Sequence, residues 1–339
     1  MAVLSSDRLT LLDWARRVDP DGKIAAVVET LNEYNEILDD ITFIEGNLPT
    51  GHKVTVRASL PTPTWRLLNQ GVTSTKSQSN QITEVCGMME AYSTIDKDLA
   101  KLNGNTAEFR YTEDIAHIEA MNQEFAKTLI YGDTSVDPEE FVGLAPRYYA
   151  TTGTTTAGNV ISAAGAGSDN TSMWLVGWSP STIAGIFPKG SKAGLDVQDL
   201  GEQTVNDSDG KPFQAYRTHF QWKAGIAVKD WRYVVRICNI DISALETAGD
   251  VADTSTNLLK QMSIAIDKLP SNGTVRPVFY CNNRVRAMIR VKLLNKSNTY
   301  ITLKDWLSPI SGLKRPTLAF QDIPIRRIDQ IHNLEAVIA

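Results

Sequence analysis

Residues 105–132 read NTAEFRYTEDIAHIEAMNQEFAKTLIYG, and this stretch decides the fold. One set of positions recurs at alternating steps of four and three residues, which places it on one side of a helix: Tyr111, Ile115, Ile118, Asn122, Phe125 and Leu129. Asn105 and Thr106 supply capping groups at the start, and Gly132 predicts a left-handed stop at the end. A helix over 105–131 would be roughly 40 Å long, more than twice the mean globular length. We interpret it as a spine to which other parts of the chain attach.

Upstream of the spine, residues 46–96 predict an extended hairpin. Residues 52–60 (HKVTVRASL) alternate apolar and polar side chains without a fault, which is the pattern of a two-faced strand. Residues 61–80 form a polar tip, and strand-like composition then resumes, with a phase slip near Gly87 that favours a bulge. A two-stranded ribbon is marginal on its own in water, so the hairpin needs a partner surface. A flexible loop over an enzyme cleft is the alternative.

The flanking regions predict a mixture of helices and strands. Residues 5–17 and 23–38 predict two short helices, which fit either the start of a domain or an arm that packs on a neighbouring subunit. Residues 173–242 are dense in strand signals, with a strand at Trp174–Trp178 and a hairpin-type turn at Asp207–Gly210. Further predicted elements are a surface loop at 151–171, helices after Asp253 and Asn282, and strands at 275–281, 317–320 and 323–328. The fold class is therefore α+β.

Composition excludes several classes of protein. The chain has 339 residues, of which 42% are hydrophobic and 22% charged, as in a globular protein with a sizeable core. Its net charge of −5 argues against a protein whose main task is to grip nucleic acid. No run of about 18 apolar residues is present, which predicts no membrane span, and no secretory signal is visible at the N-terminus. Cys86, Cys238 and Cys281 are widely spaced, which fits free thiols in a reducing cytoplasm and not a disulfide framework.

The sequence shows no convergent set of catalytic or metal-binding groups. None of the four histidines lies at metal-ligand spacing from a suitable partner. Gly165–Gly167 lacks the third glycine and the lysine of nucleotide-binding loops. One basic helix face could meet phosphates or make a salt-bridged subunit contact, and it consists of Arg284, Arg286, Arg290 and Lys292. We therefore predict no catalytic residue, no bound metal and no cofactor.

Three segments after the spine carry long motifs. They are EFVGLAPRY at 140–148, WLVGWSPSTIAGIFPKGSKAGLDVQDLG at 174–201, and DWRYVVRICNID at 230–241. In this order, they resemble the major capsid proteins of short-tailed phages of the epsilon-15 type. The resemblance implies a Hong Kong 97-type capsid fold with an N-terminal arm, an extended β-hairpin arm, a peripheral domain with a long spine helix, and a mixed α/β axial domain. The corresponding ranges are 1–45 for the N-terminal arm, 46–96 for the hairpin arm, 97–150 for the peripheral domain with its spine at 105–131, 151–300 for the axial domain, and 301–339 for the return to the peripheral domain.

The resemblance also implies a function, that of the major head protein of a tailed double-stranded DNA phage. Such a protein assembles into hexamers and pentamers of an icosahedral shell, is made in the bacterial cytoplasm and resides in the virion. The expected partners are copies of itself, a portal, a decoration protein and packaged DNA that is contacted non-specifically, with no membrane. No scaffolding segment fits before residue 40, so a separate scaffolding protein is expected. The alternatives are another self-assembling virion or scaffold protein, such as a portal or tail component, and an enzyme with a long lid hairpin.

Two sets of contact residues are expected on this basis. The intersubunit set lies on the hairpin and consists of Val54, Val56, Arg57, Leu60, Trp65 and Lys76. The spine set consists of Ile115, Ile118, Phe125 and Leu129. We expect the spine set to be buried against the terminal strands.

Overall fold

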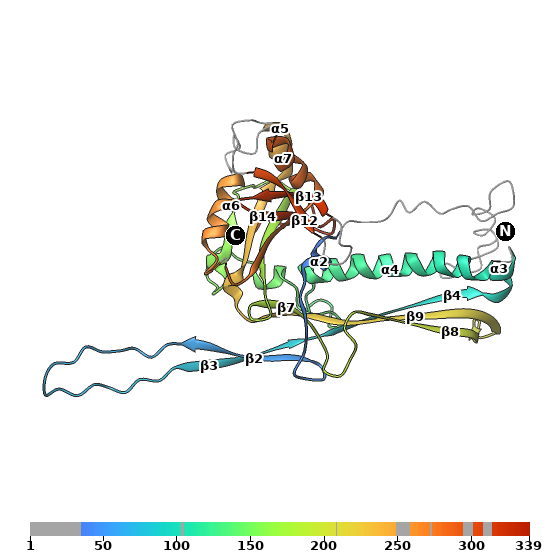
Figure 1. Cartoon of the computed structure of the whole chain (residues 1–339), viewed down its shortest axis with the longest axis horizontal. Coiled ribbons are helices and arrows are strands. Elements are labelled where there is room, and N and C mark those ends of the chain that lie inside the picture. Colours follow the sequence, from blue (N-terminus) through green and yellow to red (C-terminus); the bar gives the residue numbers. More distant parts are fainter. Residues whose placement is uncertain are drawn as a thin grey trace. The chain divides into compact units, whose positions relative to one another are not determined.

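A computed structural model describes residues 35–102, 105–207, 209–248, 258–271, 273–293, 301–307 and 314–339 (Figure 1). Within them the chain divides into two compact units. We call residues 88–126 and 194–223 the spine unit, and residues 36–87, 127–193 and 224–339 the sheet unit. The two predicted N-terminal helices lie outside the described residues, apart from a short helix α2 at Ile37–Asp40. The predicted cap at Asp253 also lies outside them.

The predicted spine is helix α4, Thr106–Tyr131, which has residues in both units (Figure 1). Asn105 caps it, because its Oδ1 accepts the backbone N–H of Glu108 at 3.4 Å. The predicted left-handed stop at Gly132 is wrong, since the φ of Gly132 is not positive. The chain instead folds back so closely that a Cβ at Gly132 would lie 2.4 Å from the carbonyl oxygen of Phe141. The backbone N–H of Gly143 donates to the carbonyl of Gly132 at 2.8 Å, which fixes this close approach.

The spine unit combines α4 with helix α3 and three strands. These elements are α3 at Lys97–Lys101, β4 at Gly87–Asp96, β8 at Leu195–Asn206 and β9, which runs from Pro212 to Val228 and continues into the sheet unit. Strands β8 and β9 form an antiparallel hairpin, and β4 pairs with β9. The predicted turn joins β8 to β9, where Asp207 Oδ1 accepts the N–H groups of Asp209 and Lys211. Ile95, Leu99, Ala100 and Phe109 form a buried cluster within this unit.

The predicted apolar stripe of α4 is buried only in part. Phe125 is 3% exposed, and its ring stacks on Trp222 of β9 with 4.3 Å between ring centroids. Leu129 is fully buried and Ile115 half-buried, whereas Ile118 is 39% exposed. The expectation that the stripe packs on the terminal strands is wrong for Phe125, because β9 occupies that place. The remaining apolar flank of α4 is open in the isolated chain.

Phe125→Asp should destabilise the spine unit by several kcal/mol, because it places a carboxylate without a partner against the Trp222 ring. The matched control is Ile118→Asp, the same type of substitution at an exposed position of the same helix. We expect the control to cost less than about 1 kcal/mol. Urea unfolding followed by tryptophan fluorescence measures both. Equal losses of stability in the two variants would show that the stacking of Phe125 on Trp222 does not stabilise the spine unit.

The sheet unit is built on a seven-stranded sheet in the order β12-β13-β14-β11-β6-β10-β5 (Figure 1). The strands are β5 at Val160–Ser162, β6 at Asn170–Trp178, β10 at Val234–Asp241, β11 at Arg276–Cys281, β12 at Ile301–Leu307, β13 at Lys314–Phe320 and β14 at Ile323–Arg327. Every residue of β6 is buried, since β6 lies between the antiparallel neighbours β10 and β11. This explains the apolar run that predicted a strand at Trp174–Trp178.

Helices α5 at Ile242–Ala248, α6 at Leu258–Asp267 and α7 at Asn283–Leu293 complete the sheet unit. Asn282 caps α7 as predicted, because its Oδ1 accepts the backbone N–H of Val285 at 2.9 Å. The loop expected at 151–171 is wrong in part, since β5 pairs with β10 there in parallel. A 3-10 turn at Trp231–Tyr233, which the side chain of Asp230 caps, separates β9 from β10.

Two predicted boundaries change in the structure. Residues 173–242 do not form one block, because 194–223 belong to the spine unit, where β9 carries the aromatic rings that face α4. The hairpin expected over 46–96 is also shorter. Its second strand ends at Val85, and after Cys86 the chain continues as β4, which pairs with β9 instead. The phase slip near Gly87 therefore marks a change of sheet and not a bulge.

A short strand β1 at Phe43–Glu45 pairs in parallel with β7 at Ile183–Phe187, and β7 pairs with the end of β9.

All three cysteines are free thiols. Burial raises the pKa of the Cys86 and Cys238 thiols to about 11 and that of Cys281 to about 12, so all three stay protonated at neutral pH. Among the described residues, no group of three His, Cys, Asp or Glu side chains could hold a metal ion. No described helix is long and apolar enough to cross a bilayer.

Candidate assembly interface

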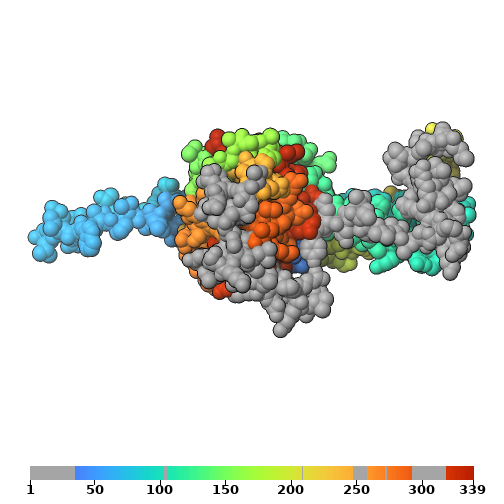
Figure 2. Space-filling view, turned by 90° about the horizontal axis from the view of Figure 1, so that it is seen from above, coloured from blue at the N-terminus to red at the C-terminus, as the bar shows by residue number. Residues whose placement is uncertain are grey.

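Strands β2 at Gly51–Ser59 and β3 at Gln78–Val85 form an antiparallel ribbon that continues into an extended loop (Figure 1). We call residues 51–85 the arm. Gly51 pairs with Val85 at its base, and the register shifts between Arg57 and Ser59. Residues 57–83 are all exposed. In the view of Figure 2, no other described element covers the arm, which is coloured blue.

The loop of the arm exposes several large apolar side chains to solvent. Trp65 is fully exposed, and four other large apolar side chains are at least half exposed: Leu60, Leu67, Leu68 and Val72. Five large apolar side chains within thirteen residues are unusual on a monomer surface and are typical of an interaction site. Full burial of one such side chain contributes about 1.5–3 kcal/mol. Burial of these side chains by another surface would therefore be strongly favourable.

The exposed part of the arm also carries charge of one sign. Residues 51–83 contain Lys53, Arg57, Arg66 and Lys76 and no Asp or Glu, although the whole chain has a net charge of −5. Of the predicted contact residues, Val54 and Val56 are half-buried on one face of β2, whereas Arg57, Leu60, Trp65 and Lys76 are exposed. A surface that covers the arm should be apolar and acidic in character.

The base of the arm is rigidly held. The side chain of Asn47 both accepts from the backbone N–H of Lys53 and donates to its carbonyl, each at 2.7 Å. A Cβ at Gly51 would lie 2.0 Å from the carbonyl oxygen of Glu84, so only glycine allows the two strands to meet there. The N–H of Cys86 donates to the carbonyl of Thr50 at 3.0 Å. The base of the arm is therefore fixed, whereas its loop is exposed.

A buried ion pair fastens this base to the rest of the sheet unit. Arg147 donates from Nη1 and Nη2 to the two carboxylate oxygens of Glu84 at 2.6 and 2.7 Å. The side chains of Glu84 and Arg147 are only 7% and 19% exposed. Arg147 Nε also donates to the carbonyl of Gly143, and its Nη2 to that of Val142. The loop that follows α4 therefore locks the second strand of the arm.

Arg147→Met should cost about 3 kcal/mol of stability, because it leaves the Glu84 carboxylate buried without its partner. The double variant Arg147→Met/Glu84→Gln should recover part of this loss, since no uncompensated charge remains. The control is Lys211→Met, which removes an exposed ion pair with Asp209 and should cost at most about 1 kcal/mol. Urea unfolding measures all three variants. A double variant that is no more stable than Arg147→Met alone would contradict the coupling.

A second buried ion pair holds the C-terminal segment, and we call it the tail clasp. Arg236 of β10 donates from Nη2 to Glu335 Oε2 at 2.9 Å, with side chains 5% and 7% exposed. The same guanidinium donates to the carbonyl of Tyr148 and to Ser172 Oγ. Glu335 also accepts from the hydroxyl of Tyr131, at the end of α4. The clasp therefore joins the tail, the central strands and the end of the spine helix.

Comparisons with known proteins agree with this architecture. The family described as "Major capsid protein GP7" matches residues 19–339. The chain belongs to the GP7 major capsid protein family. A structure of bacteriophage epsilon15 is 33% identical, has a TM-score of 0.77, and is matched over 100% of this chain and 99% of that chain. This confirms the predicted resemblance and the Hong Kong 97-type capsid fold class. A search of curated proteins gives no match.

Two more distant capsids share less with this capsid protein. The bacteriophage JBD30 capsid is 10% identical with a TM-score of 0.47, and the match covers 89% of this chain and 92% of that one. The capsid of Myoviridae phage XM1 is 11% identical with a TM-score of 0.43, and the match covers 63% and 95%. The protein is a major capsid protein, a structural component of the virion head.

Sequence reasoning found the arm but missed both buried ion pairs. Glu84 and Arg147 lie 63 positions apart, and Arg236 and Glu335 lie 99 apart, so no local pattern links them. Their signal was nevertheless present, since Arg147 and Arg236 belong to two of the three motifs that carry the family resemblance. An arginine within an otherwise apolar strand such as VVRICNI indicates a buried partner.

Proposed function

We propose that this capsid protein assembles into hexamers and pentamers of a closed icosahedral shell, and that the arm is an intersubunit contact. The observation that supports this is the arm itself, with a rigid base and with apolar and basic side chains exposed from residue 57 to 83. An isolated subunit gains nothing from exposing this surface. A neighbouring copy that covered the arm would bury it.

The mechanism of such an assembly is geometric. In a closed symmetric shell each contact recurs in every subunit, so a modest gain per arm is multiplied. Subunits bound in the shell are stabilised by mass action relative to free ones. The exposed apolar flank of α4, with Ile118 and Tyr111, is a further surface that such a lattice would cover. On this proposal the contact residues are Val54, Val56, Arg57, Leu60, Trp65 and Lys76.

The domain roles follow from the same proposal. Residues 1–45 serve as the N-terminal arm, 46–96 as the hairpin arm, 97–150 with 301–339 as the peripheral domain, and 151–300 as the axial domain. The mixed sheet of the sheet unit supports the axial assignment. Two segments are exceptions. The 194–223 hairpin packs with α4 and fits the peripheral domain. Strands β12, β13 and β14 belong to the same sheet as β11, β6, β10 and β5, so residues 301–339 fit the axial domain and not the peripheral domain. Loops of the axial domain would meet at the capsomer centres.

The proposal also covers the partners of the protein, its lack of catalytic activity and its lack of a bound metal. A scaffolding protein, a portal and a decoration protein assist assembly in the host cytoplasm, and the shell encloses DNA that it contacts non-specifically. The protein has no catalytic activity and holds no metal. Elemental analysis after dialysis against a chelator tests the last point, and a stoichiometric metal would contradict it.

The experiment that tests the function is electron microscopy of the purified protein, co-expressed with the neighbouring genes of its genome. Closed shells with five-fold and six-fold capsomers are the expected result. Rings of a single size would instead support a portal or tail component. Monomers that stay dispersed in the presence of all co-expressed partners would overturn the proposal.

A further inference from the structure

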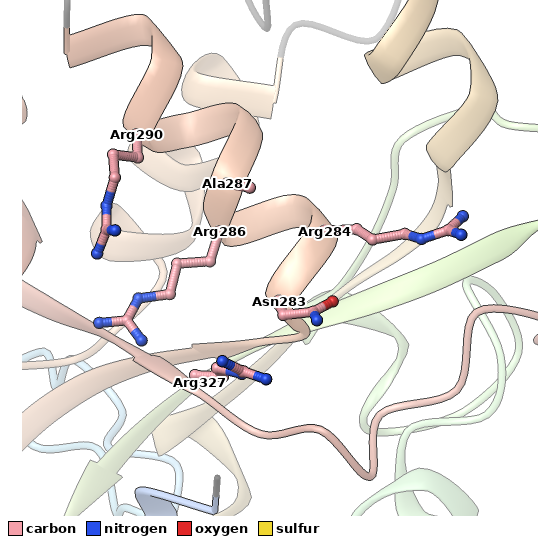
Figure 3. A pocket seen from close by; sticks show the side chains of 6 residues that line it. All are labelled: Asn283, Arg284, Arg286, Ala287, Arg290 and Arg327. Atoms are coloured by element: carbon pink, nitrogen blue, oxygen red, sulfur yellow. The ribbon is translucent and has the colours of Figure 1, made fainter. Parts of the chain in front are cut away.

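Helix α7 borders an open hollow of about 370 Å³ that is rich in arginine. Its lining consists of Asn283, Arg284, Arg286, Ala287, Arg290 and Arg327 (Figure 3). Figure 3 shows the side chains of Arg286 and Arg290 leaving the same side of α7, with Arg327 next to them on β14. Four of the six lining residues are arginines, so the hollow suits an anionic ligand.

The arginines of this hollow are unequally neutralised. Arg327 makes a bidentate pair with Asp329 at 2.6 and 2.7 Å, and Arg286 Nη1 lies 3.6 Å from Glu36. Arg284 approaches Glu246 only to 3.9 Å, with both side chains about half exposed. Arg290 is exposed and has no ion-pair partner among the residues that the structure describes. The hollow therefore has uncompensated positive charge.

One donor in the hollow is unused. Arg286 Nε is buried and has no hydrogen-bond partner within the described part of the chain. A buried N–H of this kind costs free energy unless a ligand or water satisfies it. The support beneath it is rigid, because Val285 and Ile289 of α7 are buried and Asn282 caps the helix. The part of α7 that carries Arg286 and Arg290 is therefore held in place ahead of any ligand.

We infer that this hollow is a phosphate-binding site for the backbone of the enclosed nucleic acid, with Arg286 and Arg290 as its donors, since their side chains leave the same side of α7 whereas that of Arg284 points the other way (Figure 3). Planar guanidinium groups match phosphate oxygens in geometry and keep their charge at any physiological pH. Arginine makes up four of the six lining residues, which favours a phosphodiester backbone, whose charged oxygens accept from planar guanidinium donors. This inference rests on the proposed function, because it requires that the protein encloses nucleic acid.

The test measures binding of the full-length, unassembled protein to a fluorescent 20-base-pair DNA duplex over a range of salt concentrations. Arg290→Gln should weaken binding and reduce the slope of log K against log salt by about 1, for the one lost phosphate contact. The matched control is Lys189→Gln, which removes one cation from an exposed position of the 188–193 loop and should change the slope far less. Circular dichroism verifies that each variant is folded.

Three outcomes would overturn the inference. The first is an unchanged slope in the arginine variant, and the second is an equal change in the lysine control. The third is arginine-dependent binding of a hexaglutamate peptide, used as the probe for an acidic segment, with no arginine-dependent binding of DNA. Failure of the proposed function looks different, since shells would then be absent by electron microscopy whatever the result with DNA.

Discussion

Replacing residues 61–80 with a two-residue turn should leave the subunit folded and abolish stable shells. The replaced segment is exposed throughout and contributes nothing to the buried core of the described chain. Val54 still pairs with Ile82 across the shortened hairpin, whereas Val56 loses its partner Asn80. Each subunit nevertheless loses Trp65 and its apolar neighbours, and this loss recurs around the whole lattice. Circular dichroism and sedimentation of the protein co-expressed with its scaffold measure the two effects.

A length-preserving variant separates side-chain contacts from arm length. Trp65→Ser/Leu67→Ser/Leu68→Ser keeps the loop and removes three exposed apolar side chains, each worth about 1.5–3 kcal/mol when buried. The matched control is Gln70→Ser/Thr73→Ser/Gln78→Ser, which changes three exposed polar side chains in the same arm. We expect shells from the control and few or none from the apolar variant. Normal, heat-resistant shells from both variants and from the shortened arm would falsify the arm's role in assembly, and loss of folding would show that the arm belongs to the core.

Arg236→Met should destabilise the sheet unit by about 3–5 kcal/mol, which lowers the melting temperature by roughly 10 °C. The substitution leaves Glu335 buried without its cation and removes donors from Ser172 Oγ and the carbonyl of Tyr148. It also removes the guanidinium that lies 4.8 Å above the ring of Trp174. Because the tail clasp joins several segments, we expect the C-terminal residues to become sensitive to proteases.

The control for the tail clasp is Arg232→Met, which breaks the ion pair between the exposed Arg232 and Asp230, two positions before it. It should cost at most about 1 kcal/mol. The double variant Arg236→Met/Glu335→Gln should be more stable than Arg236→Met alone, because the buried charge is gone. Differential scanning calorimetry compares all three variants. A melting temperature of Arg236→Met equal to that of the control would mean that the tail clasp contributes no stability.

The sequence by itself determined the local elements of this capsid protein. The four-and-three spacing of residues 105–131 predicted α4 to within a residue or two, because a helix depends on contacts between positions three and four apart. The alternation at 52–60 likewise predicted β2, since the period of a strand is two. The motifs at 140–148, 174–201 and 230–241 identified the family. All of these signals are contained in short windows of the chain.

Only the tertiary structure decided which elements meet. It ended the arm at Val85 and sent β4 to β9, because strand partners are chosen by long-range packing that no window of sequence contains. It placed 194–223 with α4 through the stacking of Phe125 on Trp222. It gave Gly132 a role in close backbone approach, where the sequence indicated a left-handed turn. It also joined Glu84 to Arg147 and Arg236 to Glu335, because a buried charge requires a partner wherever in the chain that partner lies.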